Sequence, residues 1–404
     1  MWPPTMPIPR YRTHEGPALF SAGFRPFFLG AALWSALAVP VWLMIFAGHE
    51  GAPALAPMVW HAHEMVYGYG AATLAGFLLT AIPNWTGRLP LQGAPLAGLV
   101  GLWAAGRAVL LVPAVGAVAA TIVDLAFPLV FLAVVAREII AGRNWRNLPM
   151  VAALAALLAG NALVHADALG VSASADAGNR LGIATLLMLI GLVGGRIVPS
   201  FTRNWLVKAL PGATEPAPFD RFDRAVLALT AIALVLWVVV PDASASAVAA
   251  LAAGLAIAAR LARWRGGRTW REPLVLVLHV GYAWLALGLI LLGLDAFVPL
   301  LPPSAALHAL TVGAIGTMTL AVMTRASLGH TGRALAAGRG TVAIYMLVTI
   351  AALLRLHAPL AGSRYLLLLA LAGAAWSAAF GLFALLYAPA LARPRLRGEQ
   401  PRPA

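Results

Sequence analysis

The chain has 404 residues, of which 61% are hydrophobic and 10% are charged, and its formal net charge is +14. A soluble globular protein carries about 25% charged residues, so this composition excludes the soluble classes and indicates an integral membrane protein. The absence of cysteine excludes disulfides, iron–sulfur clusters and cysteine nucleophiles. We expect the excess of basic residues to lie in cytoplasmic loops and not to bind nucleic acid.

Apolar stretches recur along the chain at the length of about 20 residues that a spanning helix needs. They predict twelve spans, with the pairs at 94–136 and 223–262 the least distinct: 23–47, 58–83, 94–113, 116–136, 148–168, 181–200, 223–240, 244–262, 272–294, 304–324, 340–358 and 365–390. The prediction is therefore an all-α polytopic membrane protein with a single transmembrane domain over 1–404. The bundle covers about 18–390, and the basic tail at 391–404 is expected to be disordered.

Lysine and arginine predict the orientation of these spans. With the N-terminus and the C-terminus both in the cytoplasm, 24 of the 28 basic residues lie on the cytoplasmic side. This bias follows the positive-inside rule and requires an even number of spans.

The second span opens, on the outer side, with two imidazoles, a carboxylate and a thioether at His61, His63, Glu64 and Met65. Ionisable groups at a membrane helix are costly and mark a functional site by default. On a regular helix His61 and His63 point about 200° apart, whereas His61, Glu64 and Met65 share a face. Histidine with methionine suits copper, although interfacial histidines can also be simple anchors.

His308 opens the tenth span from the same outer side and is a candidate further ligand for that site. Its span is rich in glycine and threonine, which allows a flat cofactor such as haem to approach closely. His279 lies about 12 Å into the ninth span from the cytoplasmic side. It is a second candidate axial ligand, and the sequence does not rank the two.

Arg107 and Asp124 fall at similar depths in the third and fourth spans, which a short turn connects. We predict an ion pair between them that faces the interior of the bundle. The pair is either structural, or Arg107 neutralises a buried anion such as a haem propionate.

A second polar set lies at the cytoplasmic ends of the spans. Its members are arginine, asparagine and histidine residues near glycine, serine and threonine: Arg25, Asn84, Arg196, Arg203, Asn204, Arg325 and His330. Each could be an ordinary membrane anchor. Together they predict a shared cluster that binds an anion, lipid head groups or haem propionates.

Four motifs carry a resemblance to a known family. GFRPFF at 23–28, WHAHEM at 60–65 with GFLLTAIPNWTGR at 76–88, GGRIVPSFTRNW at 194–205 and HALTVGAIGTMTLAVMTRASLGHTGR at 308–333 resemble the signatures of the NnrS family. The resemblance implies a multi-pass protein of the bacterial inner membrane that contains haem, expected to be b-type, and copper. It implies a link to nitric oxide metabolism, nitrosative stress and denitrification. The motif histidines to which it extends are His61, His63, His308 and His330.

Three functions remain open. The first is a haem–copper protein in the lipid bilayer that binds or turns over nitric oxide, as an oxidoreductase with an unidentified electron donor. The second is a twelve-helix transporter of a metal or metal–nitrosyl species, although the sequence shows no clear internal repeat and few intramembrane carboxylates. The third is a sensor that binds haem without turnover.

Overall fold

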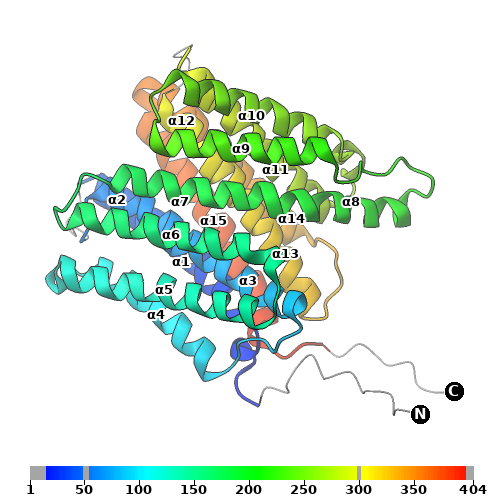
Figure 1. Cartoon of the computed structure of the whole chain (residues 1–404), viewed down its shortest axis with the longest axis horizontal. Helices are drawn as coiled ribbons and strands as arrows, with labels where there is room; N and C mark the ends of the chain where they lie inside the picture. Colours follow the sequence, from blue (N-terminus) through cyan, green and yellow to red (C-terminus); the bar gives the residue numbers. More distant parts are fainter. Residues whose placement is uncertain (1–14, 49–53, 298–301, 397–404) are drawn as a thin grey trace.

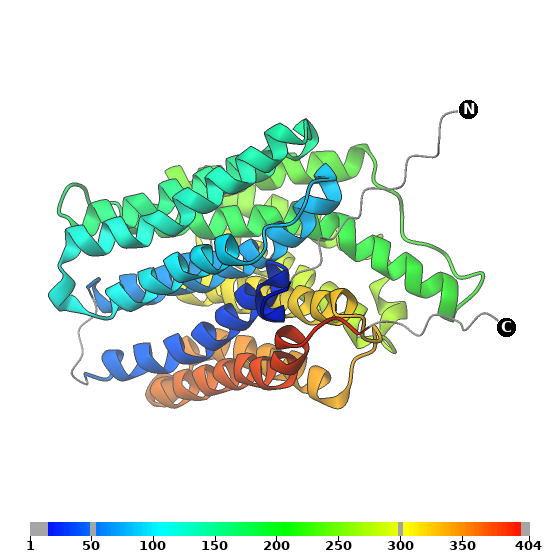
Figure 2. The ribbon, with the colours of Figure 1, turned by 90° about the horizontal axis from the view of Figure 1, so that it is seen from below.

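The computed structural model describes residues 15–48, 54–297 and 302–396, and within these ranges the chain contains helices and no strand. Eleven helical segments are long and apolar enough to cross a membrane, and the shorter apolar helix Ala94–Leu110 lies at the remaining expected position. The prediction of a polytopic all-α fold with about twelve spans is confirmed. The helices run side by side along the long axis of the molecule in both ribbon views (Figure 1, Figure 2).

Nine spans are single helices. They are α1 (Phe24–Phe46), α4 (Ala94–Leu110), α5 (Ala117–Ala141), α6 (Leu148–Ala168), α9 (Arg221–Val239), α10 (Ser244–Ala262), α11 (Pro273–Asp295), α14 (Arg339–His357) and α15 (Tyr365–Ala392). The other three are each interrupted by a π-helical segment. These are α2 (Pro57–His63) and α3 (Ala71–Thr86) around Glu64–Gly70, α7 (Ala175–Leu189) and α8 (Gly195–Ala209) around Ile190–Gly194, and α12 (Pro303–His308) and α13 (Thr317–His330) around Ala309–Gly316.

Two spans extend at least six residues beyond a predicted end. The span predicted at 181–200 covers 175–209, and the span predicted at 304–324 continues to residue 330. Both extensions contain arginine and other polar residues. These polar residues lower the hydropathy by which a span is recognised, but they do not interrupt helical hydrogen bonding. The helix therefore continues beyond the end of the apolar stretch.

The three interrupted spans are the second, sixth and tenth in chain order and form the centre of the bundle. Their apolar windows are 78%, 61% and 67% buried, against 28% for the window of α5. Only α11, also at 67%, is comparably buried among the described spans. π-helical turns are rare and are frequently found at functional sites, so the centre of the bundle is where a site is expected.

The chain repeats a packing pattern every four spans. The first span of each group packs on the interrupted second span, and the third packs on the fourth. Contacts of α5 with α6, α10 with α11 and α15 with α1 then close the ring. The start of α1 and the end of α15 lie side by side (Figure 2).

A short sequence pattern accompanies this structural repeat. Gly-x-x-Thr-Leu occurs at 70–74, 182–186 and 316–320, once in each interrupted span. In each case the threonine hydroxyl donates to the carbonyl four residues earlier, at 3.1 Å for Thr73, 2.7 Å for Thr185 and 2.7 Å for Thr319. The sequence alone shows no clear internal repeat, because five residues in a span are too few to stand out in an apolar sequence.

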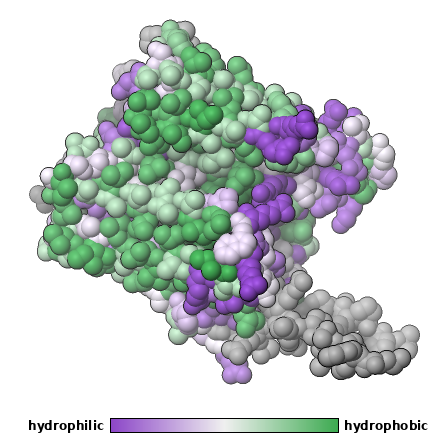
Figure 3. Space-filling view, viewed as in Figure 1, coloured by the Kyte–Doolittle hydropathy of each residue, from purple (hydrophilic) through white to green (hydrophobic). Residues whose placement is uncertain are grey.

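The distribution of polarity on the surface suits a bilayer. Large hydrophobic side chains such as Leu37, Val118, Ile122 and Leu385 are exposed. Hydrophobic residues cover most of the face shown in Figure 3, and hydrophilic residues gather at the end of the molecule that holds α8. This arrangement places the middle of the bundle in lipid.

The C-terminal tail contacts the bundle as far as the structure describes it. Helix α15 ends at Ala392, two residues beyond the predicted bundle. The Arg25 guanidinium donates to the carbonyls of Leu391 and Arg393, both at 2.7 Å, and the Leu396 amide donates to the Thr331 carbonyl at 3.0 Å. The remainder of the tail predicted to be disordered, 397–404, lies outside the described residues.

Candidate cofactor cavity and buried ionic cluster

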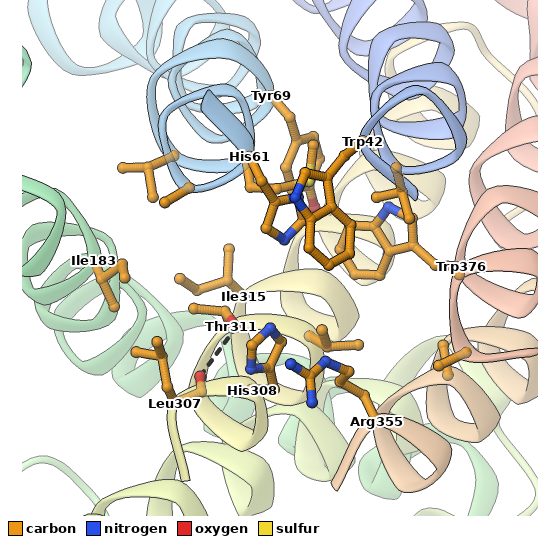
Figure 4. A pocket seen from close by; sticks show the side chains of 18 of the residues that line it. Trp42, His61, Tyr69, Ile183, Leu307, His308, Thr311, Ile315, Arg355 and Trp376 are labelled. Carbon is orange, nitrogen blue, oxygen red and sulfur yellow. Dashed lines mark hydrogen bonds between the residues drawn. The ribbon is translucent and has the colours of Figure 1, made fainter. Parts of the chain in front are cut away.

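A partly open cavity of about 170 Å³ lies between α1, α2, α7, α14, α15 and the α12–α13 span. Most of its lining is apolar or aromatic, and its polar side chains include His61, His308 and Arg355. His61 and His308 come from opposite sides of this space, as Figure 4 shows. We call it the His61–His308 cavity.

The two imidazoles are held differently. His308 Nδ1 lies 2.6 Å from the Ser304 carbonyl oxygen. Because a carbonyl only accepts, Nδ1 carries the proton and Nε2 keeps its lone pair, which is the usual arrangement of a histidine that binds a metal. The His61 ring stacks on Trp42, with centroids 4.2 Å apart, and its buried Nδ1 has no hydrogen-bond partner within the described residues.

Met65 lines the same cavity, so the structure brings together His61, Met65 and His308 as expected. Glu64 does not join them, and the prediction that it shares their face is wrong. Its carboxylate accepts from Trp34 Nε1 at 2.7 Å and from Arg107 Nη1 at 3.1 Å. A buried carboxylate is stable only where it meets donors, and these donors lie on another side of the helix.

Arg355 was not recognised from the sequence, where it looked like an ordinary charge at a helix end. It is buried in the cavity wall, and its Nη1 has no hydrogen-bond partner in the described part of the chain. An unpaired buried cation is costly, so this guanidinium is suited to an anionic group that enters the cavity.

A second group of polar side chains, the buried ionic cluster, lies beside the cavity. It consists of His63, Glu64, Arg107, Asp124, Asn161 and His165, all at most 4% exposed. Arg107 bridges the two carboxylates through separate nitrogens, Nη1 to Glu64 and Nη2 to Asp124. The predicted Arg107–Asp124 ion pair is confirmed.

Asp124 is the hub of this cluster. Its Oδ2 lies 2.8 Å from Asn161 Nδ2, 3.0 Å from His165 Nε2 and 3.2 Å from His63 Nε2. His63 Nε2 is also 2.8 Å from Asn161 Oδ1, and its Nδ1 is 3.0 Å from Glu64 Oε1. Both ring nitrogens of His63 therefore face acceptors, and an imidazolium satisfies them both. That charge with Arg107 balances the two carboxylates.

His63, Asp124 and His165 also form a set of possible metal ligands, because their ligand atoms lie within 4.8 Å of one another. Asn161 and His165 were missed by the sequence reasoning. Their spacing of four residues places them on one face of a membrane helix, which is the signal that could have identified them.

A larger cavity of about 520 Å³ lies near the other ends of the spans, and we call it the His330 cavity. It collects four members of the predicted polar set, Asn84, Arg196, Arg325 and His330, among aromatic walls. The Arg325 guanidinium stacks on the Phe201 ring at 4.0 Å. His330 is the last residue of α13.

The other predicted residues lie elsewhere. Arg25 binds the carbonyls near the end of α15, Arg203 pairs with Glu215 at 2.8 Å on the surface, and Asn204 is exposed. His279 is buried, and its Nε2 lies 2.8 Å from Thr202 Oγ1. His279 does not line the two cavities described above.

These features define a helical multi-pass membrane protein with a histidine-lined cavity and a buried ionic cluster at its centre. The chain belongs to the NnrS family, because the family model described as NnrS protein matches residues 18–395. A search of curated proteins finds no match. The four motifs that carried the resemblance all lie within the matched range.

Proposed function

We propose that this chain is a haem- and copper-containing protein of the bacterial inner membrane that binds or metabolises nitric oxide. The observation that carries the proposal is the pair formed by His61 and His308. Two spans far apart in the sequence present imidazoles to one mostly apolar cavity, and the Ser304 carbonyl fixes His308 with Nε2 as the free nitrogen.

The residues of the His61–His308 cavity fit haem in their chemistry. His61 or His308 could hold the haem iron, Trp42 and Trp376 could provide aromatic walls, and Arg355 could pair with a propionate. The bound group would supply a redox-active iron able to bind a diatomic ligand. The cavity volume of about 170 Å³ is below the range of roughly 300–1,000 Å³ typical of ligand pockets. We therefore expect its apolar walls to separate on loading.

Copper is less well accommodated. In the buried ionic cluster the carboxylate of Asp124 already accepts from Arg107, His63, His165 and Asn161. A second cation there would have to displace satisfied hydrogen bonds and approach a guanidinium. Met65 adds a soft thioether donor in the cavity, but copper enters the proposal through the family resemblance.

The chain's own residues determine what could reach the cofactor. The cavity is mostly apolar, so an uncharged diatomic molecule loses little hydration on entry, whereas a hydrated ion would lose much.

The test is an absorption spectrum of the detergent-purified protein, first oxidised, then reduced with dithionite, then with nitric oxide. A Soret band that shifts at both steps supports the proposal. His61→Ala and His308→Ala should each lose haem, measured as pyridine haemochromogen per protein. His357→Ala is the matched control because His357 is an exposed histidine at the end of α14. Full haem in both cavity variants would refute the assignment.

A second candidate is a twelve-span transporter of a metal or metal–nitrosyl species. The observation that favours it is the presence of cavities toward both ends of the bundle, the His61–His308 cavity and the His330 cavity. Protein without a Soret band from haem-replete cells, together with metal uptake into proteoliposomes, would favour the transporter.

A further inference from the structure

A third cavity lies between the two already described, and we call it the middle cavity. Its volume is about 90 Å³, and this partly open space is lined by α3, α6, the α7–α8 span and the α12–α13 span. Each of the three Gly-x-x-Thr-Leu segments contributes to its wall, through Gly70 and Thr73, Leu186, and Thr319. The cavity therefore lies where the three repeated spans meet.

The wall of the middle cavity carries no formal charge. Every lining residue is apolar apart from Thr73 and Thr319. Their hydroxyls donate within their own helices, Thr73 to the Tyr69 carbonyl at 3.1 Å and Thr319 to the Ile315 carbonyl at 2.7 Å. A hydrated ion would lose its water there without receiving a charged partner.

The three cavities are adjacent and share wall residues. Leu186 and Ile315 line both the His61–His308 cavity and the middle cavity. On the other side, a shared set of apolar residues separates the middle cavity from the His330 cavity: Phe77, Met150, Val193, Ile197 and Val322. The three cavities therefore lie in a row along the bundle. Leu186 and Ile315 lie between the middle cavity and the His61–His308 cavity.

Closely packed glycines determine how much space remains in the middle cavity. A Cβ atom at Gly70 would lie 2.8 Å from Leu186 Cδ1, and one at Gly194 would lie 3.1 Å from Met318 Cε. Both glycines belong to π-helical segments and line the middle cavity. A larger residue at either position would push a neighbouring side chain, so the passage depends on small residues at these turns.

We propose that the three cavities form a conduit for a small uncharged molecule of diatomic size between the His330 cavity and the His61–His308 cavity. A volume of about 90 Å³ exceeds the roughly 10–15 Å³ that a single water molecule needs, so a diatomic molecule fits in the middle cavity. The uncharged wall therefore disfavours hydrated metal ions on this route. Binding of this molecule at a cofactor held by His61 and His308 rests on the proposed function, whereas the existence of the conduit does not.

The first test uses xenon, which occupies dry apolar cavities, in crystals of the full-length chain under xenon pressure. We expect anomalous density in the middle cavity next to Leu186 and Ile315. Leu186→Phe and Ile315→Phe should each remove it. Leu181→Phe, on the same helix as Leu186 but outside the three cavities, should leave it unchanged. No xenon in the unmodified protein, or xenon retained in both filled variants, would overturn the conduit.

The second test applies to protein whose Soret band establishes haem. After flash photolysis of the carbon monoxide complex, Ile315→Phe should slow bimolecular rebinding about tenfold relative to Leu181→Phe, a barrier increase of about 1.4 kcal/mol. Equal rates in the two variants would refute the route. Protein without haem would refute the proposed function instead, and the xenon experiment would still decide whether the conduit exists.

Discussion

The change Asp124→Asn tests whether the buried ionic cluster is held by charge. Asp124 faces four donors: Arg107 Nη2, Asn161 Nδ2, His165 Nε2 and His63 Nε2. An asparagine of the same shape has one acceptor oxygen and turns an amide donor toward some of these donors. It also leaves Arg107 with Glu64 as its one remaining carboxylate partner among the described residues.

The expected cost follows from this geometry. Removing one partner of a buried ion pair costs about 3–5 kcal/mol, a large part of a total stability of about 5–15 kcal/mol. With an unfolding entropy of about 2.1 cal/mol/K for each residue, the 404 residues give about 0.85 kcal/mol/K. The predicted fall in Tm is then about 4–6 °C.

The assay is thermal unfolding of the purified protein in one detergent, followed by tryptophan fluorescence. Asp242→Asn is the control, because Asp242 is an exposed carboxylate and its replacement should change Tm by less than about 1 °C. The double variant with Arg107→Gln should lose less than the sum of the two single losses, because the two side chains interact. An unchanged Tm for Asp124→Asn would refute the charge-based account of the cluster.

Three further predictions concern single charges. Arg355→Met should lower haem content while leaving the Tm of the haem-free protein equal or higher, because it removes an unpaired buried charge; unchanged haem would contradict the role given to this residue. The hydrogen bond from Arg263 lowers the pKa of Asp220 below its usual range, so this carboxylate remains ionised as the pH falls through about 4. The stability that Asp220 gives to the first turn of α9 should be fully present above that pH and be lost only in stronger acid. In Asp220→Ala, amide exchange in that turn should be faster at every pH above 4, and equal exchange rates would contradict the cap. Glu215→Gln should change the stability by less than about 1 kcal/mol in thermal unfolding, because its ion pair with Arg203 is exposed, and a larger loss would contradict this view.

The spans could be predicted because lipid imposes a simple rule on sequence. The hydrogen bonds of backbone groups in a bilayer must be made within helices. The twelve apolar stretches therefore correspond to twelve helical spans near the expected positions in the described part of the chain. Depth along two connected spans was enough to pair Arg107 with Asp124. These inferences depend only on the depth of each residue in the membrane. They do not depend on how each helix is rotated about its own axis.

Features that depend on helix rotation could not be predicted in the same way. The direction of Glu64 depends on donors at Trp34 and Arg107, which lie in other spans. Glu64 also begins a π-helical segment, which departs from the 3.6-residue period used to assign its face. The inward position of Arg355 depends likewise on how α14 packs, because the sequence places this residue simply at a helix end.

The cavity and the cluster are connected through one turn of helix. His61 faces the cavity and His63 faces the cluster, in agreement with the angle of about 200° expected between them. Glu64, next in the chain, is fixed by Arg107 and Trp34. The cluster therefore holds the turn that carries His61, and loss of its charge balance should disturb the cavity without removing any cavity residue. Haem content in Asp124→Asn separates the two effects: partial loss with His61 and His308 intact indicates a positioning role, and full retention at reduced Tm indicates that the cluster stabilises the fold alone.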